Sequence, residues 1–251
     1  MKFGITGRLT LILAVLGIAV SGLTGFYAYS VSRELLAQSA QTELMTATHV
    51  LAGRITLTRQ EVSRNLQVLA GMPEALASLK SQSGRNRDTT DLASDFKQFL
   101  KVNPAYYQIR LISATDGGIE RVRVDREGDA LLDITGDALQ EKGHFLYVSE
   151  TLKLKAGQTY LSEIVINHER GAHAGQNQPT VLLAAPVIDL QGTAVGIIAI
   201  NMNLNGMFAL LASDLPTDFQ LYLANHHGDL LIHPADSSTK CNAMECKRAH
   251  G

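Results

Sequence analysis

The sequence has few of the features that mark catalytic, redox or nucleic-acid-binding proteins. It has no tryptophan and only two cysteines, Cys241 and Cys246. Two thiols at this spacing, without further cysteines, are a weak signal for a zinc or redox site, so we interpret them as incidental. A formal net charge of −2 gives no electrostatic reason to expect nucleic acid as a partner.

Catalytic and metal-binding patterns are also scarce. There is no glycine-rich phosphate loop, and His168-Glu169-Arg170 with His173 lacks the spacing of a zinc protease motif. The stretch His226 to His233 holds ligand types that suit zinc, but a polar hairpin tip explains it more simply. We therefore predict no catalytic residues, no metal site and no cofactor.

Charged residues are absent between Arg8 and Arg33, and Leu9 to Tyr29 is strongly apolar. As a helix this uncharged run spans about 36 Å, which is enough to cross a bilayer core of about 30 Å. Lys2 and Arg8 precede it without an acid, which favours a cytoplasmic N-terminus. The sequence thus predicts a cytoplasmic stub (1–8), one transmembrane helix (9–30) in the inner membrane, and a periplasmic remainder.

Two other N-terminal interpretations stay open. A cleaved signal peptide would use Leu9 to Val20 as its apolar core and Ala28-Tyr29-Ser30 as its cleavage site. The anchor is favoured because the apolar run continues through Phe26-Tyr27 into a helical pattern. A pilin-like start is less favoured, since no glutamate follows within the run.

A helical pattern continues after the anchor. Its apolar residues recur at steps of seven, four, seven, four and three, the spacing of one helical face: Leu44, Leu51, Ile55, Val62, Leu66 and Leu69. Gly71-Met72-Pro73 predicts a break and a restart. We predict a long stalk helix within residues 31–80, which either pairs with a second copy as a homodimer or is simply solvated.

Beyond the stalk the apolar period changes to two, which indicates strands. A polar loop (81–91) and a short helix capped by Asp91 come first. Residues 193–202 are apolar on both faces and should form a central strand. We predict an α+β fold in which helices flank an antiparallel sheet of five strands. The strands are expected at residues 106–112, 119–125, 159–166, 180–188 and 193–202, with a helical turn at 137–142, an ambiguous segment at 145–154, and a closing helix at 204–211.

Several sequence blocks resemble the double Cache (PAS-like) periplasmic sensor domains of bacterial receptors. They keep the family order over residues 31–235 and comprise Tyr106 to Ile112 with Asp116 to Val124, Leu139 to Phe145 with Gly157 to Ser162, and Ala184 to Gly192 with Gly196 to Asn201. The resemblance implies a small-ligand-binding module whose receptors end in histidine kinase, chemoreceptor or cyclic-di-GMP output domains.

The same resemblance implies a domain organisation. Residues 81–213 would form the membrane-distal ligand-binding domain, and residues 214–239, with a hairpin at 219–233, would begin a second Cache unit. Residues 240–251 do not follow the family pattern. We therefore expect a truncated receptor that lacks its output domain.

Candidate ligand-binding residues centre on the first hairpin. Arg110 has apolar neighbours on both sides and is expected to point inward, whereas Arg121 and Arg123 alternate with valines and are more simply solvent-facing. A guanidinium can bind a carboxylate bidentately, and tyrosines can wall such a pocket. The candidate set is Tyr107, Arg110, Arg123, Tyr147, Tyr160 and Asp189, and the expected ligand is an organic acid or an amino acid. A membrane-anchored hydrolase and a dimerising scaffold that binds nothing are the alternatives.

Overall fold

The computed structural model describes residues 5–80, 87–166, 179–213, 215, 219–224, 228 and 230–232. The chain divides into two units, Met1–Ile55 and Thr56–Gly251. Cys241, Cys246 and the histidines at positions 168, 173, 226, 227 and 233 lie outside the described residues, as does the segment 240–251.

In the first unit the described residues belong to helix α1 (Ile5–Ala70), which continues into the second unit without a break at residue 30. Its apolar side chains, such as Leu13, Ile18 and Phe26, are exposed. The most apolar window has a mean hydropathy of 2.2, and none of it is buried. This helix is therefore long and apolar enough to cross a membrane, as the sequence predicts.

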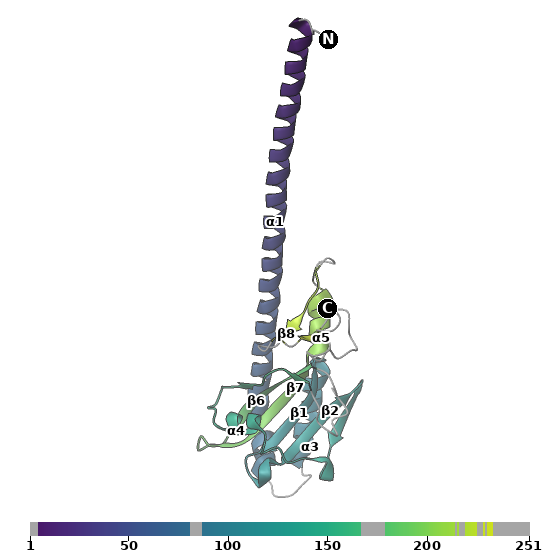
Figure 1. Ribbon diagram of the computed structural model, residues 1–251. Helices are drawn as coiled ribbons and strands as arrows, with labels where there is room; N and C mark the ends of the chain where they lie inside the picture. The colour runs from purple at the N-terminus through teal and green to yellow at the C-terminus, as the bar shows by residue number, and fades with distance from the viewer. Residues whose placement is uncertain are drawn as a thin grey trace. The chain divides into compact units, whose positions relative to one another are not determined.

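The second unit is built on an antiparallel sheet of seven strands in the order β3-β2-β1-β7-β6-β4, with β5 also paired to β6 (Figure 1). Strand β7 lies between β1 and β6, which confirms the central strand expected from its apolar sequence. The strands are β1 (Tyr106–Ser113), β2 (Glu120–Glu127), β3 (Ala130–Ile134), β4 (Tyr160–Leu161), β5 (Val165–Ile166), β6 (Pro179–Ile188) and β7 (Ala194–Asn203).

Helices cover the first face of this sheet and bury an apolar core against it. They are the last turns of α1, α2 (Pro73–Lys80) and α3 (Arg87–Val102). The helices contribute Val62, Leu66, Leu69, Leu92, Phe96 and Leu100 to this core, and the strands contribute Ile109, Leu111, Val122, Val124, Ile198 and Ile200. The break between Ala70 and Pro73 lies where the sequence predicts it.

The second face carries a smaller apolar cluster and a set of buried polar residues. Helix α4 (Leu146–Leu152) contributes Tyr147 and Val148, which pack with Ile112, Leu182 and Ile197. The first face, by contrast, buries the larger apolar core.

Some predicted elements differ from the structure. The sheet has seven strands where five were expected. Strand β3 was missed, and the segment 159–166 forms two short strands, β4 and β5, in place of one. Ser162 lies between them, and its Oγ accepts a hydrogen bond from the backbone N–H of Leu182. Asp91 is not a helix cap, since α3 begins at Arg87 and includes it. The ambiguous segment 145–154 contains α4. The helical turn expected at 137–142 is a short 3₁₀ turn at Gly136–Ala138.

The expected stalk face is partly used within the chain itself. Val62, Leu66 and Leu69 are at most 1% exposed, because they pack against the sheet of their own domain. Helix α5 (Leu204–Ser213) closes the main sheet region as predicted. Strands β8 (Leu223–Ala224) and β9 (Leu230–Ile232) pair antiparallel, which confirms the hairpin expected at 219–233.

Candidate functional site

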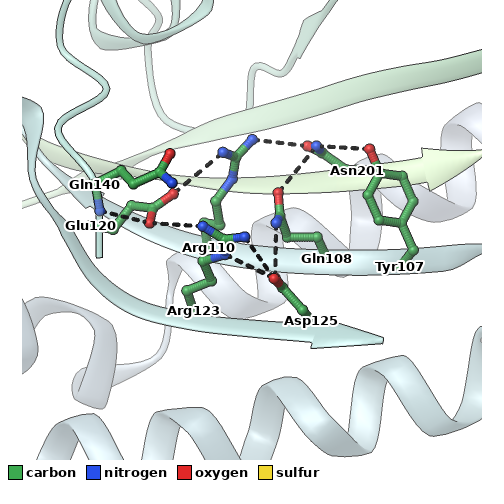
Figure 2. A network of polar contacts seen from close by, with 8 residues as sticks. All are labelled: Tyr107, Gln108, Arg110, Glu120, Arg123, Asp125, Gln140 and Asn201. Atoms are coloured by element: carbon green, nitrogen blue, oxygen red, sulfur yellow. Dashed lines mark hydrogen bonds and ion pairs between the residues drawn. The ribbon is translucent and has the colours of Figure 1, made fainter. Parts of the chain in front are cut away.

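A buried polar network occupies the second face of the sheet, and Figure 2 shows its side chains converging from three strands. In a strand, every second side chain lies on the same face of the sheet. Arg123 and Asp125 of β2 therefore lie on one face, next to each other. On β1 a register shift between Tyr106 and Gln108 interrupts this alternation. Both Tyr107 and Gln108 consequently reach Asn201 of β7, each at 3.2 Å from its amide nitrogen.

Arg123 and Asp125 form the tightest pair of this network. The guanidinium donates from Nε to Oδ1 at 2.9 Å and from Nη2 to Oδ2 at 2.6 Å, and both residues are 2% exposed. Gln108 Nε2 also donates to Asp125 Oδ1, at 2.8 Å. Burial by itself lowers the pKa of Arg123, but the hydrogen bonds and charge of Asp125, with the charge of Glu120, outweigh burial and raise this pKa.

The expectation that Arg123 faces solvent is therefore wrong. Arg123 does alternate with valines, but the face on which it lies is buried as well. Arg121 is partly exposed, with 21% of its side chain accessible, and its Nη2 donates to Asp116 Oδ2 at 2.7 Å.

Glu120 links two arginines and a connecting segment. Its Oε1 lies 3.4 Å from Arg110 Nη1, and its Oε2 lies 3.4 Å from Arg123 Nη1. The backbone N–H of Gln140 also donates to Oε2, at 3.1 Å. These ion pairs are longer than the 2.7–2.9 Å typical of strong charge-assisted bonds, so Glu120 is shared between its partners and not locked to one of them.

Arg110 points inward, which confirms its predicted orientation, and it is fully buried. Its Nη2 donates to Asn201 Oδ1 at 3.2 Å, and its guanidinium carbon lies 5.7 Å from the centre of the Tyr147 ring. This distance suits a cation–π contact. The structure thus brings Arg110, Tyr107, Arg123 and Tyr147 together on one face.

The two other candidate residues have different surroundings. Tyr160 of β4 is half-buried and packs against the apolar cluster of the second face. Asp189 lies in the turn between β6 and β7, where its Oδ1 accepts the backbone N–H groups of Gln191 (3.0 Å) and Thr193 (2.8 Å). Asp189 therefore shapes a turn, and these bonds do not connect it to the network.

Several network members were missed in the sequence: Gln108, Glu120, Asp125 and Asn201. Gln108 and Asn201 are polar residues inside strands whose other residues are mostly apolar, and that contrast is the signal that would have identified them. Glu120 and Asp125 lie on β2, which is mostly polar, so no such contrast marks them. Lys142 was also missed; it is 3% exposed, and its ammonium lies 5.0 Å from the Phe145 ring centre. Within the described ranges, no group of three or more His, Cys, Asp or Glu is placed to hold a metal ion.

Comparison with protein families supports a sensory role for this fold. Residues 56–249 match the family model described as the bacterial histidine kinase sensor domain. The matched span includes most of residues 240–251, the segment that we expected to fall outside the family pattern. No match was found among curated protein sequences.

Solved structures with the same fold are also sensory domains. A domain of a sensory box/GGDEF family protein from Vibrio parahaemolyticus has a TM-score of 0.66 and 17% identity over 79% of this chain and 73% of that one. The extracellular domain of the protein vpHK1S-Z8, described as a histidine kinase, has a TM-score of 0.66, 15% identity, and coverage of 79% and 71%. The ligand-binding domain of the Campylobacter jejuni chemoreceptor Tlp3 has a TM-score of 0.58, 13% identity, and coverage of 85% and 77%.

Proposed function

Because the chain belongs to the family of bacterial histidine kinase sensor domains, we propose that it is the small-ligand-sensing region of a receptor in the inner membrane. Sensor domains of this family are extracytoplasmic, and α1 is long and apolar enough to span a membrane. In this proposal α1 crosses the membrane once, and residues that follow it lie in the periplasm. Lys2 and Arg8, on the short flank, favour this orientation.

The proposed ligand is an organic acid or an amino acid, recognised on the second face of the sheet. The observation that carries this proposal is Arg110, a fully buried cation between Glu120, Asn201 and the Tyr147 ring. A buried charge is costly, and the first face buries an extensive apolar core against the same sheet. Retention of buried ion pairs on the second face therefore supports recognition of a polar ligand there.

The chemoreceptor Tlp3 was solved with L-valine and with isoleucine, so this fold accommodates aliphatic amino acids in that protein. Its sequence identity to this chain is 14%, which supports only the fold. The chemistry of the ligand must therefore be argued from Arg110 and its neighbours, which favour a carboxylate.

We infer a competition mechanism from the geometry around Glu120. A ligand carboxylate would replace Glu120 as the partner of Arg110, because that ion pair is long at 3.4 Å. Glu120 would keep its contacts with Arg123 and with the Gln140 backbone. Release from Arg110 would let Glu120 take a second position and carry the bonded Gln140 segment with it, and a ligand that favours this position would shift the equilibrium.

The test is calorimetric titration of the whole chain, in lipid nanodiscs, with amino acids and organic acids. We expect at least one carboxylate to bind saturably. Its affinity should fall by about tenfold or more in Arg110→Lys, which keeps the charge but loses the two-pronged donor geometry. Arg87→Lys is the matched control, because the Arg87 side chain is 93% exposed.

Two outcomes would contradict the proposal. One is that no compound of either class binds the unmodified chain. The other is that the affinity is the same in Arg110→Lys as in Arg87→Lys, provided that both variants show the melting temperature of the unmodified chain.

A further inference from the structure

A cavity of about 470 Å³ lies beside the outer edge of β2. Its walls come from α2 and α3, which cover the first face, and from the segment that follows β3. Its lining includes Ser78, Arg121, Val122, Ile134 and Leu139. A volume of this size is within the range of about 300–1,000 Å³ that is usual for small-molecule sites.

The cavity results from the way in which the sheet edge is paired. Strand β3 pairs with β2 as far as Ile134, opposite Arg123. The next contact along this edge is the bridge between Ile119 and Glu141. Residues 135–140 therefore lie opposite the shorter segment 120–122, and a 3₁₀ turn at Gly136–Ala138 takes up the excess length. The chain consequently leaves the edge of β2, and the cavity occupies this gap.

Two hydrogen-bond donors at this cavity lack a partner in the part of the chain that the structure describes. Ser78 is 1% exposed, and the buried Arg121 Nε is part of a guanidinium whose Nη2 is paired with Asp116. Among the residues that the structure describes, neither Ser78 Oγ nor Arg121 Nε has a hydrogen-bond partner. A buried donor without a partner costs about 1–3 kcal/mol, so both positions favour an acceptor supplied from outside the chain.

We propose that this cavity is a second ligand site, which takes a small carboxylate with a short apolar chain. The carboxylate would accept hydrogen bonds from Arg121 and Ser78, and the apolar chain would contact Val122, Ile134 and Leu139. The positive guanidinium favours a carboxylate over a neutral carbonyl group. The side chain of Asp116 is 62% exposed, so water screens its competing negative charge. Two carboxylates of the lining, Glu120 and Asp133, are already paired with cations, Glu120 with Arg110 and Arg123 and Asp133 with Lys97.

The cavity is separate from the Arg110 site but adjoins it. Arg110 and Tyr147 do not line it, whereas Glu120 and Arg123 do. A carboxylate in the cavity would therefore contact the strand that carries the shared carboxylate of the buried network. A ligand in the cavity would therefore change the affinity of the Arg110 site for its own ligand without competing for that site.

The experiment is calorimetric titration of the whole chain in nanodiscs with butyrate, isovalerate and hexanoate, with butanol as the uncharged comparison. We expect saturable binding of at least one acid and much weaker binding of butanol. Leu139→Trp, which fills the cavity, and Arg121→Gln, which removes the charge, should each weaken acid binding by about tenfold or more. Leu190→Trp and Arg87→Gln are the matched controls, because Leu190 is 90% exposed and the Arg87 side chain is 93% exposed.

Further variants separate this site from the proposed first site and from unfolding. Acid binding in the cavity should persist in Arg110→Lys, so loss of the first site does not mimic loss of the second. Ser78→Ala removes a donor that lacks a partner and should raise the melting temperature of the free protein while weakening acid binding. The proposal is overturned if none of the acids binds, or if binding is equal in Leu139→Trp and Leu190→Trp.

Discussion

At the scale of single residues, the balance of buried charge decides how the second face behaves. Arg110 and Arg123 are matched by Glu120 and Asp125, so the four charges can be buried together. Removal of one member leaves an uncompensated charge, whereas exchange of a whole pair for apolar side chains does not.

Asp125→Asn should lower the free energy of unfolding by about 3–5 kcal/mol, because Arg123 would lose the carboxylate that balances its charge. The double variant Arg123→Met with Asp125→Leu should recover most of this loss. Chemical denaturation in detergent micelles measures both. Asp129→Asn, at an exposed turn position, is the control and should change stability by less than about 0.5 kcal/mol. A double variant no more stable than Asp125→Asn would argue against the charge-balance explanation.

Tyr106 makes the stability of the domain sensitive to alkaline pH. Its pKa is raised to about 12, first by burial and then by the charge of Glu61, against the opposing hydrogen bond from Asn65. In the unfolded chain the phenol loses its proton near its ordinary pKa of 10.0. The folded state therefore holds the proton to a higher pH than the unfolded state, and stability should fall as pH rises between these two values.

Tyr106→Phe should reduce this alkaline loss of stability, because phenylalanine has no proton to release. Denaturation measured from about pH 9 to about pH 12 gives the slope for each variant. Tyr222→Phe is the control, since Tyr222 is 48% exposed. Equal slopes in the two variants would show that Tyr106 is not the group responsible.

The sequence predicts part of the arrangement of these buried residues. The apolar neighbours of Arg110 predicted its inward orientation, because a residue that shares a buried strand tends to be buried itself. The partners of Arg110 and Arg123 were not predictable, since they depend on the register between β1 and β2. Burial of Arg123 depends on how the second face is covered, which no local pattern encodes.

At the scale of elements, one close backbone contact holds the segment after β3 against the start of β2. The backbone of Gly118 pairs with Lys142 at 2.9 Å, and Gly143 pairs with Gly117 at 2.9 Å. A Cβ on Gly118 would lie 2.5 Å from Gly143 Cα, so no larger residue fits without displacement of the backbone. Gly118 also has a φ of +74°.

Gly118→Ala should therefore destabilise the domain by about 3 kcal/mol or more. Gly128→Ala provides a matched control, because Gly128 also has a positive φ, +58°, but an added Cβ would meet nothing within 4 Å. The control should lose only the conformational cost of about 1–2 kcal/mol. Thermal denaturation of both variants separates the two effects, and equal losses would rule out the close contact as the cause.

The strands with clear apolar alternation were predictable, and the short or mixed elements were not. Strands β1, β6 and β7 appear where the period of two places them. Strand β3 was missed because its five residues, Ala130 to Ile134, show no clean alternation. Asp91 was expected to cap a helix, but α3 begins four residues earlier, at Arg87. Arg87 and Asp91 are one helical turn apart, and their side chains form an ion pair at 3.7 Å.

At the scale of the whole molecule, α1 carries large apolar side chains that are exposed. Leu44 and Ile55 are 52% and 41% exposed, whereas Val62 is 1% exposed. We propose that the exposed residues of the stalk join two copies of the chain. The triple variant Leu44→Ala, Leu51→Ala and Ile55→Ala should then convert a dimer into a monomer in sedimentation experiments with detergent-solubilised protein.

Val62→Ala distinguishes this interface from the domain core. It should leave the dimer intact but lower the free energy of unfolding by about 2 kcal/mol, because it creates a cavity in the core. Gln41→Ala with Arg59→Ala, on exposed positions, is the control for helix propensity. A triple variant that stays dimeric would exclude this part of the stalk as the interface.

The order of strands in the sheet also sets the order of events during folding. Strand β1 forms a local hairpin with β2, but its other neighbour is β7, which is synthesised roughly ninety residues later. Until β7 emerges, the apolar edge of β1 has no partner and is open to pairing with other chains. Nascent chains interrupted between β2 and β7 should therefore be the most aggregation-prone species of this protein, and completion of β7 is the step that ends this vulnerability.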